Sequence, residues 1–119
     1  MSILSAFFGA AAGSGGLTVT ASPPSLGGAA YNTIVSRTLG PCTAQPAGGS
    51  GNYTYLWTVV SSSGGATIGE PTSRASSFTL AALLGDTNYT IVRCTVTDID
   101  TGATARVDIL IQYVVYETL

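Results

Sequence analysis

The feature that most constrains this chain is a succession of short β-rich runs, separated by glycine and proline, from Leu17 to the C-terminus. Several runs alternate apolar and polar residues, as strands with one buried face do. They cover residues 17–22, 31–39, 53–60, 66–68, 76–83, 89–98 and 104–117. No segment has a helical period of useful length, which argues against an α/β architecture. The sequence predicts an all-β, antiparallel β-sandwich of about seven strands.

Prolines and glycines indicate where these runs stop or bend. The segment PPSLGG, residues 23–28, is predicted to break the chain after the first strand. Pro41 and Pro46 enclose Cys42, so the segment between them is expected to be short or bent.

The composition points to a protein that works in an assembly. The 119 residues suffice for one domain, and only 8% are charged, with no lysine and no histidine. The net charge is −2, and the mean hydropathy is +0.40. Because so few charges repel copies of the chain, we expect a homo-oligomer or a multi-copy assembly. A Ser/Thr-rich soluble monomer is the alternative.

Residues 1–16 are predicted to form an apolar arm and a glycine-rich joint, with the sandwich occupying 17–119. The arm lacks the positive region of a secretory signal. Its large apolar residues suit one face of a short helix or an extended hook, and we expect them to dock into a neighbouring subunit. They are Ile3, Leu4, Phe7 and Phe8. Folding back onto the same domain is the alternative.

A second docking candidate lies near the C-terminus. Val114, Val115 and Tyr116 run past simple alternation, which is typical of a strand covered on both faces. Burial in the chain's own sandwich explains the pattern equally well.

The two cysteines lie on either side of the only tryptophan, Trp57. Alternation in residues 90–98 turns Val92, Cys94 and Val96 to one face, which we predict is the interior. The same argument turns Cys42 inward.

At these residues the chain resembles the immunoglobulin-like superfamily. The segments GSGNYTYLW and YTIVRCTVTDIDTG are similar to bacterial and phage modules of the PKD type. The resemblance implies that Cys42 and Cys94 face each other across the sandwich and that Trp57 packs on them. Whether the two thiols are bonded is left open, because this depends on the compartment.

Most chemistry is missing from the sequence. A serine or threonine nucleophile would have no histidine or lysine to activate it, so we expect no enzyme and no cofactor. There is no basic cluster for nucleic acid and no apolar run of about 18 residues for a membrane span. Asp98 and Asp100 resemble the start of a calcium loop, but we expect a hairpin turn with Gly102 at positive φ, and no metal.

Two functions remain for such a chain. It resembles the small Ig-like proteins that decorate or cement bacteriophage capsids, since it is barely larger than one such module; a tail-associated protein is a variant of this interpretation. The resemblance implies localisation in the virion and other virion proteins as partners. The alternative is an adhesin module that binds host-surface glycans through Tyr31, Tyr53 and Tyr55.

Overall fold

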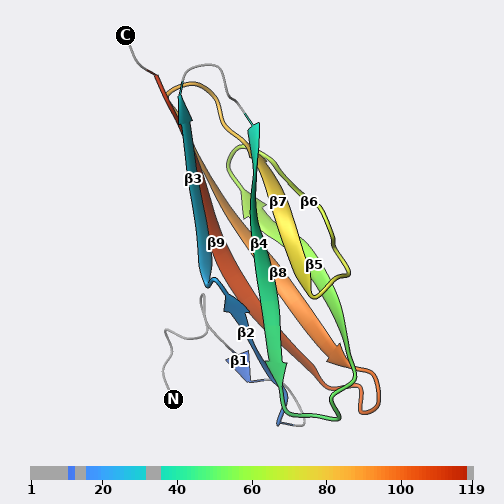
Figure 1. Cartoon of the computed structure of the whole chain (residues 1–119). Coiled ribbons are helices and arrows are strands. Elements are labelled where there is room, and N and C mark those ends of the chain that lie inside the picture. The colour runs from blue at the N-terminus through green and yellow to red at the C-terminus, as the bar shows by residue number, and fades with distance from the viewer. Residues whose placement is uncertain (1–10, 13–15, 32–35, 118–119) are drawn as a thin grey trace.

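The computed structural model describes residues 11–12, 16–31 and 36–117 of the chain. All its regular elements are β-strands, and they form two sheets that lie face to face along an elongated molecule (Figure 1). The strands are β1 (Ala11–Ala12), β2 (Thr18–Ser22), β3 (Ser25–Tyr31), β4 (Ser36–Ala47), β5 (Tyr53–Ser62), β6 (Ala66–Ile68), β7 (Ala75–Ala81), β8 (Thr87–Asp98) and β9 (Thr104–Tyr116). The predicted all-β sandwich is confirmed.

The strand order within the sheets is that of an immunoglobulin-like domain. One sheet has the order β1-β2-β4-β7-β6, and the other has the order β3-β9-β8-β5. Without the two-residue β1 and the extra strand β3, these orders correspond to the A-B-E-D and G-F-C sheets of an immunoglobulin constant domain.

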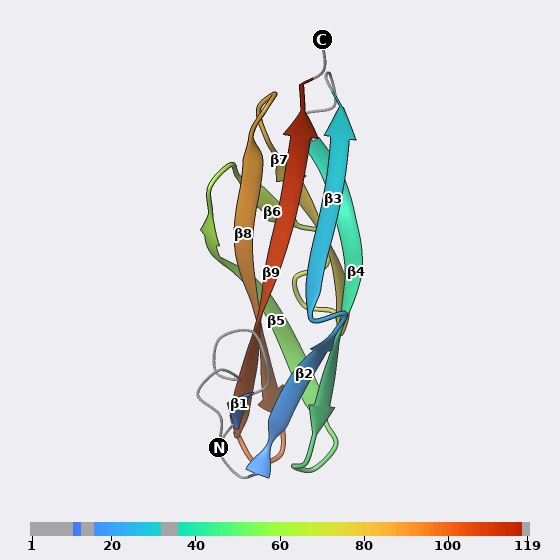
Figure 2. The same cartoon turned by 90° about the vertical axis from the view of Figure 1, so that its left-hand side faces the viewer.

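The sandwich is not antiparallel throughout. Strand β3 pairs in parallel with β9, from Ser25 opposite Leu110 to Tyr31 opposite Tyr116. Pro23 and Pro24 separate β2 from β3. At this point the chain passes from one sheet to the other and continues in the same direction (Figure 2). β3 therefore keeps the direction of β2, which is also the direction of β9. Residues 23–28 were expected to interrupt the strand pattern. This is wrong from Ser25 onward, because Gly27 and Gly28 lie within strand β3.

Strand β4 is longer than expected, although it bends where predicted. Its register with β7 shifts between Leu39 and Cys42, the positions that flank Gly40 and Pro41. The predicted run 31–39 is divided, because Tyr31 ends β3 and Ser36 begins β4.

The core lies between the sheets and follows the alternation of the long strands. In β8 and β9, every second residue is buried almost without interruption. The largest fully buried side chains include Trp57, Tyr113 and Phe78. Since side chains alternate across a strand, the other half of these two strands forms the outer surface of the four-stranded sheet.

Candidate interaction surfaces

Trp57 belongs to the buried core between the two sheets. Its indole is 1% exposed and packs edge-to-face on Phe78 of the opposite sheet, with ring centroids 5.4 Å apart. The indole Nε1–H donates to the carbonyl oxygen of Ser73 at 2.8 Å. Trp57 therefore joins β5, β7 and the loop before β7.

The two cysteines are buried, unbonded thiols. Cys94 is the direct cross-strand partner of Trp57, and Cys42 lies on the other sheet. The Cys42 thiol donates to the carbonyl oxygen of Pro23 at 3.2 Å. Burial raises the pKa of Cys42 to about 11 and that of Cys94 to about 12. For Cys94, the nearby Cys42 thiol raises the pKa further by a smaller amount. Both groups are therefore protonated core residues at neutral pH.

Asp98 organises the hairpin end of the sandwich. Its carboxylate accepts hydrogen bonds from Ser50 N at 2.6 Å, Ser50 Oγ at 2.7 Å and the backbone N–H of Asp100 at 3.0 Å. The Ser50 side chain is the largest cause that lowers the pKa of Asp98 to about 2. Gly102 has a φ of 77° and donates to the Asp98 carbonyl at 2.8 Å, so the predicted turn is present.

No group of three or more metal-ligating side chains occurs within the described ranges. Nor does this part of the chain contain a helix long and apolar enough to cross a membrane.

The surface of the four-stranded sheet that points away from the core combines apolar and threonine side chains with three charged ones; we call it the outer face. Neighbouring strands place Ile91 beside Leu110, and Leu110 beside Ser25. From the register, the outer face comprises Ser25, Gly27, Ala29, Tyr31, Thr54, Leu56, Thr58, Ser61, Thr87, Tyr89, Ile91, Arg93, Thr95, Thr97, Thr104, Arg106, Asp108, Leu110, Gln112, Val114 and Tyr116.

The charges on the outer face are few and partly paired. Arg93 donates to both carboxylate oxygens of its cross-strand partner Asp108, at 2.8 and 3.1 Å. This hydrogen bond raises the pKa of Arg93. Arg106 is the third charged residue of the outer face. A surface of threonine, aliphatic and tyrosine side chains is suited to contact with another protein.

The C-terminal docking candidates divide between the core and the outer face. Val115 is fully buried in the sandwich, whereas Val114 is half-buried on the outer face. Tyr116 is 47% exposed, and its ring stacks on that of Tyr31 at a centroid distance of 5.3 Å. Of these three residues, only Val114 and Tyr116 offer surface to a partner. The arm residues Ile3, Leu4, Phe7 and Phe8 lie outside the described residues.

The tyrosines of the glycan-binding hypothesis occupy different environments. Tyr31 is 60% exposed. Tyr53 and Tyr55 are half-buried and pack against the core, and the Tyr53 hydroxyl donates to the carbonyl oxygen of Gly48. Only Tyr31 presents an open ring, and its stack with Tyr116 could not be foreseen, since the two residues are far apart in the sequence.

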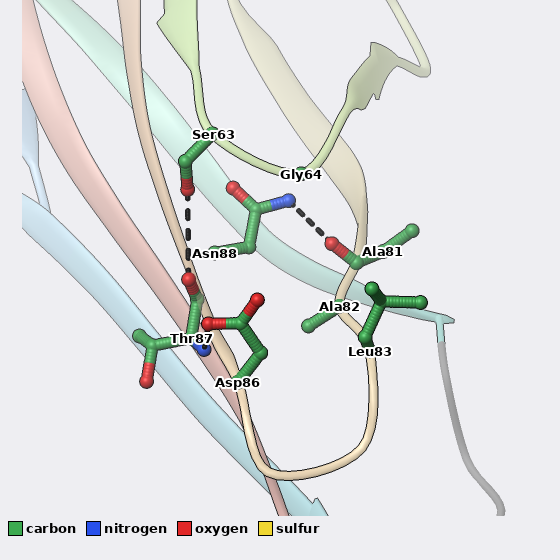
Figure 3. A pocket seen from close by; sticks show the side chains of 8 residues that line it. All are labelled: Ser63, Gly64, Ala81, Ala82, Leu83, Asp86, Thr87 and Asn88. Atoms are coloured by element: carbon green, nitrogen blue, oxygen red, sulfur yellow. Dashed lines mark hydrogen bonds between the residues drawn. The ribbon is translucent and has the colours of Figure 1, made fainter.

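A pocket that the sequence did not reveal opens at the end of the sandwich where β8 begins (Figure 3). Its volume is about 450 Å³, and two loops and the adjoining strand ends form it. The lining residues are Ser63, Gly64, Ala81, Ala82, Leu83, Asp86, Thr87 and Asn88. The one local signal was the pair Leu83 and Leu84 before a glycine–aspartate turn.

The described fold is that of a single immunoglobulin-like β-sandwich module. No family model and no curated protein matches the chain. Among solved structures, it is similar to the solution structure of the PKD domain (329–428) from human KIAA0319, with 15% identity and a TM-score of 0.42. That similarity covers 85% of this chain and 83% of the other. The fold class therefore rests on this chain's own strand order.

Proposed function

We propose that this chain is a non-enzymatic structural accessory protein of a bacteriophage particle, present in many copies and attached through its N-terminal arm and its outer face. The observation that carries the proposal is the outer face, where Arg93, Asp108 and Arg106 are the only charged residues. Covering such a surface with another protein lowers the free energy, because apolar area is removed from water and few charged groups lose their hydration.

Attachment in many copies allows each contact to be weak. Contacts that are repeated over a symmetric particle add through avidity, so no single deep site is required. The resemblance of the sequence to PKD-type modules and capsid-decorating proteins supports a role of this kind. The localisation that we propose is the surface of the virion, with capsid or tail proteins as partners.

Co-sedimentation with particles from which the protein has been removed tests the proposal. Deletion of residues 2–10, which leaves β1 and its pairing with β2 in place, should abolish attachment, while the melting temperature stays that of a folded sandwich. Ile91→Lys and Leu110→Lys should weaken attachment at least tenfold, since each places a charge on the outer face without entering the core.

Thr67→Lys is the matched control, because Thr67 is exposed on the other sheet. The proposal fails if the truncated protein still decorates particles at full occupancy, or if the control weakens attachment as much as the outer-face variants.

A glycan-binding adhesin is the second candidate, and the exposed Tyr31–Tyr116 stack favours it. Exposed aromatic rings with polar tips suit the apolar faces and hydroxyl groups of sugars. Under this hypothesis, Tyr31→Ala should abolish signals on a glycan array, whereas deletion of residues 2–10 should leave them unchanged. Arrays without a specific signal for the wild type would reject this candidate.

A further inference from the structure

The loop between β7 and β8 presents a fixed carboxylate at the pocket. Asp86 N donates to the Leu83 carbonyl at 3.0 Å, which closes a turn, and Gly85 has a φ of 75°, as the third residue of a type II turn requires. Gly85 N donates to the Val115 carbonyl at 2.7 Å, and Val115 N donates to the Asp86 carbonyl at 3.0 Å. Strand β9 thus holds the loop on both sides of the Asp86 side chain.

One oxygen of this carboxylate remains available. Asp86 Oδ1 accepts from the backbone N–H of Thr87 at 2.9 Å, and Oδ2 has no donor among the described residues. Figure 3 shows the Asp86 side chain pointing into the space between Asn88 and Leu83. The Asn88 amide is already satisfied, since it donates to Ala81 O at 2.6 Å and Gly65 O at 2.8 Å. Asp86 is also the one charged residue among those that line the pocket, so a cationic donor would meet its free oxygen.

The charge around the pocket is negative. A Cβ atom added to Gly85 would lie 3.6 Å from Glu117 Oε2, which places a second carboxylate beside the turn. The chain has no lysine, and none of its four arginines lines the pocket. Arg37 instead donates to Ala29 O, and Arg74 to Ala44 O. An incoming cation would meet no competing positive charge in the pocket lining.

The side chains that line the pocket favour some hydrogen-bond donors to Asp86 over others. No aromatic side chain lines the pocket, so a sugar ring would find no stacking surface there. Ala82 and Leu83 offer aliphatic contact, and Leu83 is 75% exposed at the rim. An apolar wall that leads to a carboxylate matches a side chain with an aliphatic stem and a cationic head.

We propose that this pocket receives a lysine or arginine side chain of a partner protein. The ammonium or guanidinium group donates to Asp86 Oδ2 in a charge-assisted hydrogen bond, and the stem packs on Leu83. This inference does not depend on the outer face or on attachment to a virus particle.

Titration of the isotope-labelled full chain, followed by amide resonances, tests the pocket. The probes are N-acetyl-lysine methylamide and N-acetyl-arginine methylamide, with N-acetyl-norleucine methylamide as the uncharged control and a methyl glucoside as the sugar. We expect saturable shifts of the Gly64, Ala82 and Thr87 amides with the cationic probes only. Added salt should reduce the affinity, because the contact is electrostatic.

Asp86→Asn keeps an acceptor for the Thr87 N–H and removes the charge, so it should weaken binding about tenfold. Asp100→Asn makes the same charge change at the opposite end of the sandwich and should leave the affinity unchanged. Unchanged spectra away from the pocket would show that both variants are folded.

The inference is overturned if neither cationic probe shifts these amides, if Asp86→Asn binds as well as the wild type, or if norleucine or the glucoside binds equally well. Shifts that appear on concentrating the protein alone, and vanish in Arg106→Gln, would assign the pocket to a second copy of this chain and also overturn it.

Discussion

Trp57 shows how a single residue can couple two sheets. Its ring fills the space against Phe78, while its N–H satisfies the Ser73 carbonyl in a loop that leads to the opposite sheet. Packing and hydrogen bonding therefore act on the same side chain. Asp98 has a comparable position at the hairpin end, where one carboxylate holds the loop of Ser50 against the turn after β8.

Trp57→Ala is expected to lower the free energy of unfolding by about 3–5 kcal/mol, because it leaves a large cavity. Urea denaturation measures this loss. Leu56→Ala is the control at the preceding position, since Leu56 is 49% exposed, and its effect should stay within about 0.5 kcal/mol. Equal effects of the two changes would show that Trp57 does not anchor the core.

Asp98→Asn should remove a pH-dependent part of the stability. The folded pKa, about 2, lies below the ordinary value of 3.8, so the ionised carboxylate stabilises the fold above about pH 4. This contribution is lost as the pH falls from about 4 towards 2. In the variant, the new amide group would direct N–H donors at the N–H groups of Ser50 or Asp100.

Urea denaturation between pH 7 and pH 2 checks this expectation. The difference between wild type and Asp98→Asn should be largest at neutral pH and should shrink below about pH 4. Asp100→Asn is the matched control, because Asp100 is exposed and, within the described part of the chain, its carboxylate accepts from Asn52 alone. A difference that is constant with pH would refute the role of the charge.

At the scale of elements, β3 shows how local composition can hide a strand. Gly27 and Gly28 are poor strand formers, and two prolines precede them. The strand exists because β9 offers a ladder of hydrogen-bonding partners from Leu110 to Tyr116. The two glycines nevertheless face different surroundings, since Gly28 points toward Leu39 and Gly27 points outward.

Substitutions in β3 should therefore have opposite effects. A Cβ at Gly28 would lie 2.5 Å from Leu39 Cδ2, so Gly28→Val should destabilise the protein by about 1–3 kcal/mol through overpacking. A Cβ at Gly27 meets nothing within 4 Å, so Gly27→Val should be neutral or slightly stabilising. Thermal melting of the two variants decides the matter; an equal loss at both positions would mean that β3 is not oriented as described.

At the scale of the whole molecule, the two sheets enclose both thiols completely. Cys42 and Cys94 lie on opposite sheets and are 0% exposed, so a reagent reaches them only when the sandwich opens. Their raised pKa values, about 11 and 12, also keep them from the reactive thiolate form at neutral pH.

Labelling of the thiols should therefore report global unfolding. We expect Cys42 and Cys94 to be unreactive toward a thiol reagent in native buffer at pH 8, and to react fully in urea. Fast labelling without urea would contradict the closed sandwich.

The raised pKa values also make the stability depend on pH. Below pH 9 both thiols are protonated in the folded and the unfolded chain, so they leave the stability unchanged. Above pH 9 the thiols of the unfolded chain ionise first, so the stability falls as the pH rises toward 11. A Cys42→Ala, Cys94→Ala variant should lose less stability over this range.

The sequence alone determined the features that depend on local periodicity. Alternation identified strands at 89–98 and 104–117 and turned Cys94 inward, because the side-chain period of a strand does not depend on its partner. The sequence also predicted the strand 66–68, which pairs with β7, and the turn at Gly102, where the hydrogen bond to Asp98 is local.

Only the tertiary structure determined which strands, loops and side chains lie next to one another. The parallel pairing of β3, the stack of Tyr31 on Tyr116 and the pocket at Asp86 all join segments that are distant along the chain. Local alternation states which face a side chain occupies and carries no information about which strand or loop arrives next to it. That choice depends on the free energy of closing the whole sandwich around one shared core.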